Sequence, residues 1–207
     1  MYCLIFLIVY LITPMTSLQI THKLYFDVNV DGKSIGQLNV GLYGIDVPQA
    51  VEKFYQLTIS DDPNVNFESN AHFNFLEPNE YIRCTYKGTL SNGGIDPEEK
   101  LQSSFDRRGL LAMVNEISND WFITLAPLPH LDGHYIVFGE IIQGMEVFQN
   151  MLNEITIDDH NTIEQDVSLD NCGELEIVPL NQRQMRNLQD TLQMEAEKPA
   201  RTLHDEL

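Results

Sequence analysis

The chain has 207 residues, which is enough for one domain with additional segments at its ends. Its 31 acidic and 12 basic residues give a formal net charge of −19 at pH 7. A surface with this charge repels nucleic acid and anionic lipid headgroups, so we exclude both as partners.

Residues 1–17 have the pattern of a secretory signal peptide. Residues 3–12, CLIFLIVYLI, are continuously apolar but too few to span a bilayer of about 30 Å as a helix. Thr16 and Ser17 supply small residues after this run, so we expect cleavage near Ser17 and a mature chain that begins near Leu18. No later apolar run approaches about 18 residues, and we therefore expect no stable membrane insertion.

The next segment predicts a β-hairpin followed by a helix. Residues 22–30 alternate as in a half-buried strand, Asp31-Gly32 is a strong turn signal, and residues 34–43 supply the returning strand. Val47-Pro48 then opens a helix, because proline is favoured in the first turn. Apolar residues at helical spacing define its buried face: Val51, Phe54, Tyr55 and Leu57.

The segment from residue 60 to residue 115 is less regular. Residues 60–80 are rich in turn residues, and we interpret them as a loop with one strand. Residues 81–85 predict the next strand, and residues 87–94 form a glycine-rich loop. Residues 96–108 are polar, so we expect them to be exposed. Residues 110–115, LLAMVN, predict a further strand.

Residues 121–147, WFITLAPLPHLDGHYIVFGEIIQGMEV, predict two strands joined by a fixed corner. The aromatic and β-branched run 121–125 is typical of a buried strand. The Leu131-Asp132-Gly133 turn then leads to a second strand from Tyr135 to Gly139. Gly144 breaks this strand, and the apolar stripe after it predicts a helix through Met145, Phe148, Met151, Leu152 and Ile155.

In their order and spacing, several short motifs in these segments resemble those of the cyclophilin-type peptidyl-prolyl isomerases. The matching pieces are Phe122-Ile123-Thr124, Leu131-Asp132-Gly133 and Val137-Phe138-Gly139, followed by a Gly-Met-Glu-Val helix entry. The two strands before a Val-Pro helix are also similar to the family. Residues 158–168 form an acidic connection, and residues 167–177 contain the closing phrase Asn171-Cys172-Gly173-Glu174-Leu175, which resembles the last strand of the family. The resemblance covers roughly residues 22–178.

The resemblance implies a mainly β fold, an eight-stranded antiparallel closed β-barrel capped by two α-helices. We place the helices near residues 48–58 and 145–155, and the cyclophilin-like domain at 18–178. After the domain, residues 179–203 predict a polar helical tail, which we interpret as a spacer rather than a docked element because its apolar stripe is narrow.

The chain ends with a retrieval signal of the endoplasmic reticulum, His204, Asp205, Glu206 and Leu207. The signal-like segment at residues 1–17 supports the same location. We therefore expect the endoplasmic reticulum lumen as the location and the retrieval receptor as a partner.

Two cysteines remain after the signal segment, Cys84 and Cys172. The compartment permits a disulfide between them, but we favour two buried, reduced cysteines because both lie in strand-like sequence. The chain has no metal-ligand spacing and no Cys-x-x-Cys motif, which argues against a disulfide isomerase. We expect neither a metal nor a cofactor.

The resemblance assigns Arg83 as the catalytic residue. The family carries its arginine in a Phe-His-Arg strand motif, and the matching segment here is Tyr81-Ile82-Arg83. Rotation about an X–Pro bond meets a barrier of roughly 18–20 kcal/mol because the amide nitrogen shares its lone pair with the carbonyl. An N–H of the cation aimed at the prolyl nitrogen stabilises the twisted amide more than the planar one. Taken alone, Arg83 is equally well explained as a solvated charge on an edge strand.

Further residues are assigned to proline binding by the resemblance. Phe122 forms the floor, although a barrel-core role explains it as well, and Leu131 forms the far wall. Proline-containing segments of secretory-pathway proteins are the expected substrates. The complete set of expected substrate-binding residues is Val114, Asn115, Trp121, Phe122, Leu131 and Tyr135.

Several positions depart from the family pattern. Ile82 and Tyr135 each stand where the family has a histidine, and Val114 replaces a small alanine. Gly88 and Thr89 stand near the positions of an aromatic residue and a methionine in the upper wall. We therefore expect a luminal prolyl isomerase of weak activity that assists secretory protein folding. The alternative is a catalytically inactive cyclophilin-like module that binds peptides or proteins as an adaptor or holdase.

Overall fold

The computed structural model describes residues 18–88, 95–96, 99, 104–114 and 119–175. The predicted signal peptide (1–17), tail (179–203) and retrieval signal (204–207) lie outside these residues. The elements are, in chain order, β1 (His22–Val30), β2 (Lys33–Leu42), α1 (Pro48–Ile59), α2 (Phe67–Asn70), β3 (Ala71–Glu77), β4 (Tyr81–Tyr86), β5 (Leu110–Met113), β6 (Trp121–Thr124), the 3-10 helix η2 (Pro129–Leu131), β7 (Ile136–Gln143), α3 (Met145–Glu154) and β8 (Thr162–Glu174).

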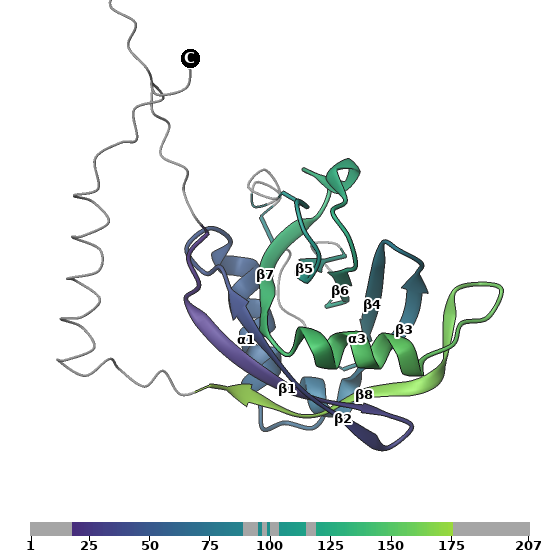
Figure 1. The fold of residues 1–207 in the computed structure, drawn as a ribbon. Coiled ribbons are helices and arrows are strands. Elements are labelled where there is room, and N and C mark those ends of the chain that lie inside the picture. The colour runs from purple at the N-terminus through teal and green to yellow at the C-terminus, as the bar shows by residue number, and fades with distance from the viewer. Residues whose placement is uncertain (1–17, 89–94, 97–98, 100–103, 115–118, 176–207) are drawn as a thin grey trace, which may run out of the picture. The chain divides into compact units, whose positions relative to one another are not determined.

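The strands close into one antiparallel barrel in the order β1-β2-β7-β5-β6-β4-β3-β8. The last strand, β8, pairs with both β1 and β3 and so completes the ring. Helix α1 packs against β7 and β8, and α3 packs against β1 and β2 (Figure 1). The predicted eight-stranded barrel capped by two helices is confirmed.

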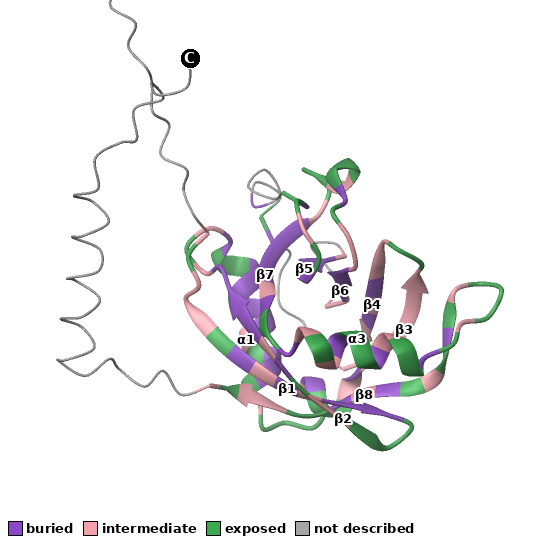
Figure 2. Cartoon of the chain, viewed as in Figure 1, coloured by how far each residue is buried: buried purple, intermediate pink, exposed green. Residues whose placement is uncertain are grey.

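An aromatic cluster fills the barrel. The ring of Phe54 on α1 lies 4.7 Å from that of Phe138 and 5.3 Å from that of Trp121, centroid to centroid. Phe26 on β1 lies 5.9 Å from Phe54, so the helix that caps the barrel is tied to the strands through aromatic contacts. Buried residues line the strands, whereas exposed residues gather at the hairpin turns and on the outer side of α3 (Figure 2).

The junction between β7 and α3 follows the predicted strand break. Gly144 has a φ of 89°, a left-handed conformation that disfavours any side chain. A Cβ atom at this position would meet the carbonyl oxygen of Gln37 on β2. Glycine is therefore required both by the turn and by the close approach of β2.

Three expectations about irregular segments need correction. Residues 60–80 contain the short helix α2 as well as β3, because Asn66 caps α2 by accepting a hydrogen bond from the Ser69 backbone N–H. β8 begins at Thr162, before the predicted start at Val167. The segment 96–108 is not wholly exposed, because the Phe105 side chain is fully buried.

Cys84 and Cys172 are both free thiols. Cys84 is buried as expected, whereas Cys172 is only half-buried, and its thiol donates a hydrogen bond to the Thr58 carbonyl at 3.5 Å. In the part of the chain that the structure describes, no helix is long and apolar enough to cross a membrane.

Candidate functional site

A cavity of about 140 Å³ opens beside β4, β5 and β6. Five of the residues expected at the site line it, namely Arg83, Val114, Phe122, Leu131 and Tyr135, together with Tyr81, which the sequence analysis did not assign. These side chains come from four separate parts of the chain. The fold therefore brings together most of the residues that the sequence pattern singles out.

The strand register explains why Arg83 and Phe122 share this face. Arg83 on β4 lies directly opposite Phe122 on β6, and Phe122 in turn lies opposite Ala112 on β5. Side chains of directly paired residues project to the same side of a sheet. Tyr81, two residues before Arg83 on β4, points to the same side because side chains alternate along a strand.

Phe122 forms the floor of the cavity and is only 2 % exposed. Its ring stacks on that of Phe105 at 6.0 Å with an interplanar angle of 7°. The rings of Tyr81 and Tyr135 lie 4.9 and 5.4 Å from it. Phe122 is therefore part of the packed barrel wall and of the cavity surface at once, so both interpretations of this residue apply.

Arg83 supplies the cation of the cavity. Its guanidinium carbon lies 4.7 Å from the centroid of the Phe75 ring, a cation–π arrangement. Its Nε atom is buried, and within the described part of the chain it has no hydrogen-bond partner. The guanidinium is thus held by an aromatic face, and its Nε–H is not used by the described residues.

Tyr81 adds a neutral donor beside Arg83. Burial raises the pKa of the Tyr81 phenol, and the neighbouring Tyr135 and Glu77 raise it further, while Arg83 acts in the opposite direction. The phenol therefore keeps its proton at neutral pH and can donate a hydrogen bond to a bound peptide.

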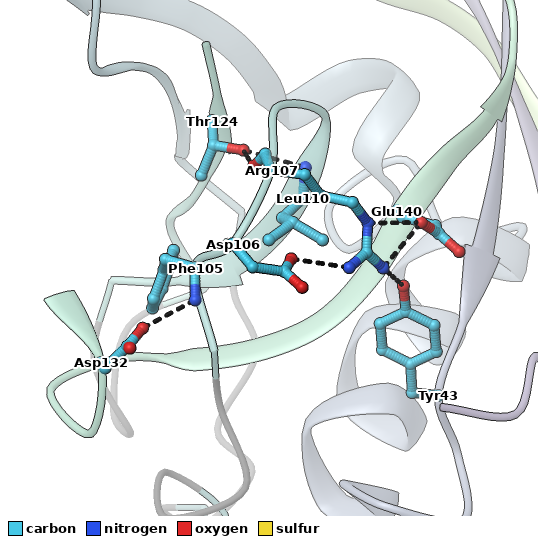
Figure 3. A network of polar contacts seen from close by, with 8 residues as sticks. All are labelled: Tyr43, Phe105, Asp106, Arg107, Leu110, Thr124, Asp132 and Glu140. Atoms are coloured by element: carbon cyan, nitrogen blue, oxygen red, sulfur yellow. Dashed lines mark hydrogen bonds and ion pairs between the residues drawn. The ribbon is translucent and has the colours of Figure 1, made fainter. Parts of the chain in front are cut away.

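A polar network holds the segment behind the cavity floor (Figure 3). The Phe105 backbone N–H donates to the Asp132 carboxylate at 2.7 Å, which ties this segment to the Leu131-Asp132-Gly133 corner. The Thr124 hydroxyl donates to the Arg107 carbonyl at 2.9 Å and accepts from the Leu110 backbone N–H at 3.0 Å. These bonds fix Phe105 against the floor.

Arg107 extends the network to the neighbouring strands. Its guanidinium donates to the Glu140 carboxylate at 2.9 and 3.1 Å and to the Tyr43 hydroxyl at 3.1 Å (Figure 3). Burial raises the pKa of Tyr43, and the charge of Glu140 raises it further, so this phenol stays protonated. The sequence analysis missed this support, and its only signal was Phe105, the single aromatic residue of the polar stretch 96–108.

Trp121 does not reach the cavity. It is 2 % exposed and lies in the barrel interior, with its ring 5.3 Å from Phe54 and 5.4 Å from Phe73. Adjacent residues of a strand point to opposite faces, so Trp121 and Phe122 cannot both line the cavity. The expected substrate-binding role of Trp121 therefore has no support from its position.

Two further expectations concern the neighbouring loops. Asn115 and Thr89 lie outside the described residues. Gly88 is described, and it does not line the cavity; a Cβ atom there would meet the Tyr86 ring and lie 2.8 Å from the Asn64 carbonyl oxygen. Gly88 is thus a packing position, and a bulky residue could not restore the cavity wall from it.

Arg83 lies on β4 and is paired with Phe75 of β3 across the strand pair. It is the one cation among the described residues that line the cavity.

The described residues contain no group of three or more His, Cys, Asp or Glu side chains that could hold a metal ion. The described side chains that line the cavity supply an arginine, two phenols and apolar surface.

Comparison with known proteins agrees with this arrangement. The family model described as cyclophilin type peptidyl-prolyl cis-trans isomerase/CLD matches residues 25–174. Peptidyl-prolyl cis-trans isomerase D of Saccharomyces cerevisiae is 38 % identical over 200 residues, which cover 91 % of this chain and 87 % of that protein. Peptidyl-prolyl cis-trans isomerase B of the same yeast is 28 % identical over 167 residues, covering 75 % of this chain and 80 % of that protein.

A third relative is longer than this chain. Peptidyl-prolyl cis-trans isomerase cyp11 of Rhizopus delemar is 32 % identical over 174 residues, which cover 75 % of this chain but 51 % of that protein. The chain therefore belongs to the cyclophilin-type peptidyl-prolyl cis-trans isomerase family.

Proposed function

We propose that this protein is a prolyl cis–trans isomerase of weak activity that acts on proline-containing segments of secretory-pathway proteins in the endoplasmic reticulum lumen. The observation that carries the proposal is the position of Arg83. Its guanidinium lines a cavity with aromatic walls and is the one cation among the described residues there. Slow X–Pro isomerisation limits the folding of many proteins, which gives such an activity a use in this compartment.

The reaction needs no covalent step. The substrate proline ring rests on Phe122 and against Leu131, and an N–H of Arg83 approaches the prolyl nitrogen. When the amide twists, its nitrogen regains a localised lone pair, and the hydrogen bond from Arg83 becomes stronger. The planar ground state offers no such lone pair, so the interaction lowers the barrier rather than only tightening binding.

The departures of the cavity from the family pattern support weak activity. Tyr135 occupies the position where the family places a histidine, and Val114 is larger than the usual alanine. A proline that is held loosely against these altered walls is poorly aligned with Arg83, and small misplacements lower the rate steeply.

A second candidate, a binding module without turnover, is favoured by the size of the cavity. Its volume of about 140 Å³ is below the roughly 300–1,000 Å³ of typical ligand pockets. Such a site admits a single side chain and little of its flanking peptide. An adaptor or holdase that holds one proline of a client needs no more than this.

An isomerase assay on an Ala-Pro peptide separates the two candidates. We expect measurable catalysis by the wild type, and a loss of kcat/KM of about 10²-fold in Arg83→Ala, which corresponds to a few kcal/mol of transition-state stabilisation. Arg108→Ala is the matched control, since Arg108 is an exposed arginine that bonds Gln149 outside the cavity. Its kcat/KM should equal that of the wild type.

If the wild type shows no catalysis, a measurement of peptide binding tests the second candidate. If the wild type does not catalyse isomerisation while the peptide still shifts the NMR signals of Phe122 and Leu131, the binding module is correct. If the peptide neither isomerises nor binds, both candidates are wrong.

A further inference from the structure

A β-bulge in β3 determines where Phe75 points. Phe73 pairs with Cys84 of β4, but the next pair is Phe75 with Arg83, so Asn74 is an extra residue in β3. Phe73 and Cys84 both point into the barrel, where Phe73 contacts Trp121. Without the extra residue, Phe75 would follow the alternation of the strand and also point inward.

The bulge reverses this alternation and places Phe75 on the outer face, opposite Arg83. The Thr85 hydroxyl of β4 donates a hydrogen bond to the Asn74 side-chain oxygen at 2.8 Å, which holds the extra residue in place. Bulges re-aim side chains, and they are common next to functional sites. Here the re-aimed side chain is an aromatic ring under the cation of the cavity.

The contact between the two side chains has the geometry of a cation–π interaction. The guanidinium carbon of Arg83 lies 4.7 Å from the Phe75 ring centroid, and the ring of Phe75 also lies 6.2 Å from that of Tyr81. Arg83 is partly buried, so it has lost part of its hydration. The cation–π attraction is therefore stronger than that of a fully exposed pair. A ring face restrains the guanidinium plane without using any of its N–H donors.

We propose that Phe75 is the positioning residue of Arg83. Its ring fixes the plane of the guanidinium in the cavity and uses none of its N–H donors. This inference rests on the proposed isomerase function for its kinetic consequence, but the orientation of Arg83 is a property of the protein alone. The two parts are therefore tested by different measurements.

The kinetic test is a double-mutant cycle. Phe75→Leu keeps apolar bulk but removes the aromatic face, and we expect kcat to fall about 5- to 30-fold with little change in KM. This range is the rate equivalent of the roughly 1 to 2 kcal/mol of a partly desolvated cation–π contact. In the Arg83→Ala background the same substitution should have no further effect. Phe75→Tyr keeps an aromatic ring of the same shape, so its kcat should equal that of the wild type.

The structural test does not depend on catalysis. The Arg83 Nε–Hε signal in the ¹⁵N NMR spectrum is identified by its loss in Arg83→Ala, and it should carry a ring-current shift from Phe75. We expect this signal to move to the position of a free arginine in Phe75→Leu and to stay in place in Phe75→Tyr. Urea unfolding of each variant verifies that the barrel is intact.

Failures of the two proposals are distinguishable. If the wild type shows no catalysis, the proposed function fails, and the NMR signal alone then decides whether Phe75 positions Arg83. If the folded Phe75→Leu variant keeps both the Arg83 signal and the wild-type kcat, Phe75 is only a packing residue and the inference is wrong. Equal effects of Phe75→Leu with and without Arg83 would also overturn it.

Discussion

At the scale of single residues, Phe122 belongs both to the packed wall and to the cavity. We expect Phe122→Ala to lower the free energy of unfolding by about 3–5 kcal/mol, because it removes a ring that contacts Phe105, Tyr81 and Tyr135. Urea denaturation measures this change. Ile142→Ala serves as the control, since Ile142 is 37 % exposed and its loss should change stability by about 0.5 kcal/mol or less. Equal stability of the two variants would contradict the packing described here.

The reactivity of the Cys84 and Cys172 thiols depends on how far each is buried. Burial raises the pKa of Cys172 from 9.0 to about 11 and the pKa of Cys84 well above its usual range. Below pH 9 the thiolate fraction of Cys172 should thus be about 10²-fold lower than in the unfolded chain, and alkylation by iodoacetamide correspondingly slower. Mass spectrometry of native and urea-unfolded protein over time measures the difference. Comparable labelling rates would show that Cys172 is not shielded.

The same pKa values set the direction of a pH effect on stability. Because the pKa of each thiol is higher in the folded state, folding favours the protonated form. The contribution is fully present below pH 9 and is lost as the pH rises through about 11 for Cys172. Cys172→Ser should reduce this alkaline loss of stability, as followed by thermal unfolding between pH 8 and pH 11.

At the scale of elements, α1 depends on a residue far away in the chain. Val47 offers no side-chain cap, and the Glu99 carboxylate instead accepts from the Gln49 and Ala50 backbone N–H groups at 2.9 and 3.1 Å. We expect Glu99→Ala to lower the free energy of unfolding by about 1–2 kcal/mol, since it leaves two N-terminal donors without this acceptor. Urea denaturation should show little change for Glu52→Ala, an exposed residue on the same helix. Equal effects of both substitutions would argue against the cap.

The sequence predicted those elements whose residues follow one regular period. Phe54 and Leu57 mark the buried face of α1, and the Asp31-Gly32 turn fixes the first hairpin. β3 was harder to predict because the bulge at Asn74 interrupts the alternation of the strand. The start of β8 was missed because exposed acidic residues such as Glu164 hide the buried position Ile163.

The candidate site was predictable where a residue lies within a continuous motif. Leu131 and Phe122 each belong to a phrase with fixed spacing, and both line the cavity. Tyr81 and Phe105 were missed, because their roles depend on which strands pair and on the Asp132 contact to the Phe105 backbone. Non-local contacts of this kind leave no period in the sequence.

At the scale of the whole molecule, the proposed location can be tested directly. We expect a mature chain that begins near Leu18 and that is retained in the endoplasmic reticulum by residues 204–207. Deletion of these four residues should release the protein to a later compartment or to the medium, as followed by immunoblotting of secreted and cellular fractions. A chain with the last four residues replaced by alanine controls for length. Unchanged retention of the deleted form would refute the retrieval signal.

The closure of the barrel has a consequence for biosynthesis. β1 is made early, but its partner β8 ends at Glu174, so one edge of β1 and one edge of β3 stay unpaired until nearly the whole domain has been synthesised. Unpaired strand edges present backbone donors and acceptors that other chains can bind, and such species are prone to aggregate. A protein proposed to assist the folding of others thus passes through a nascent stage in which it needs protection itself.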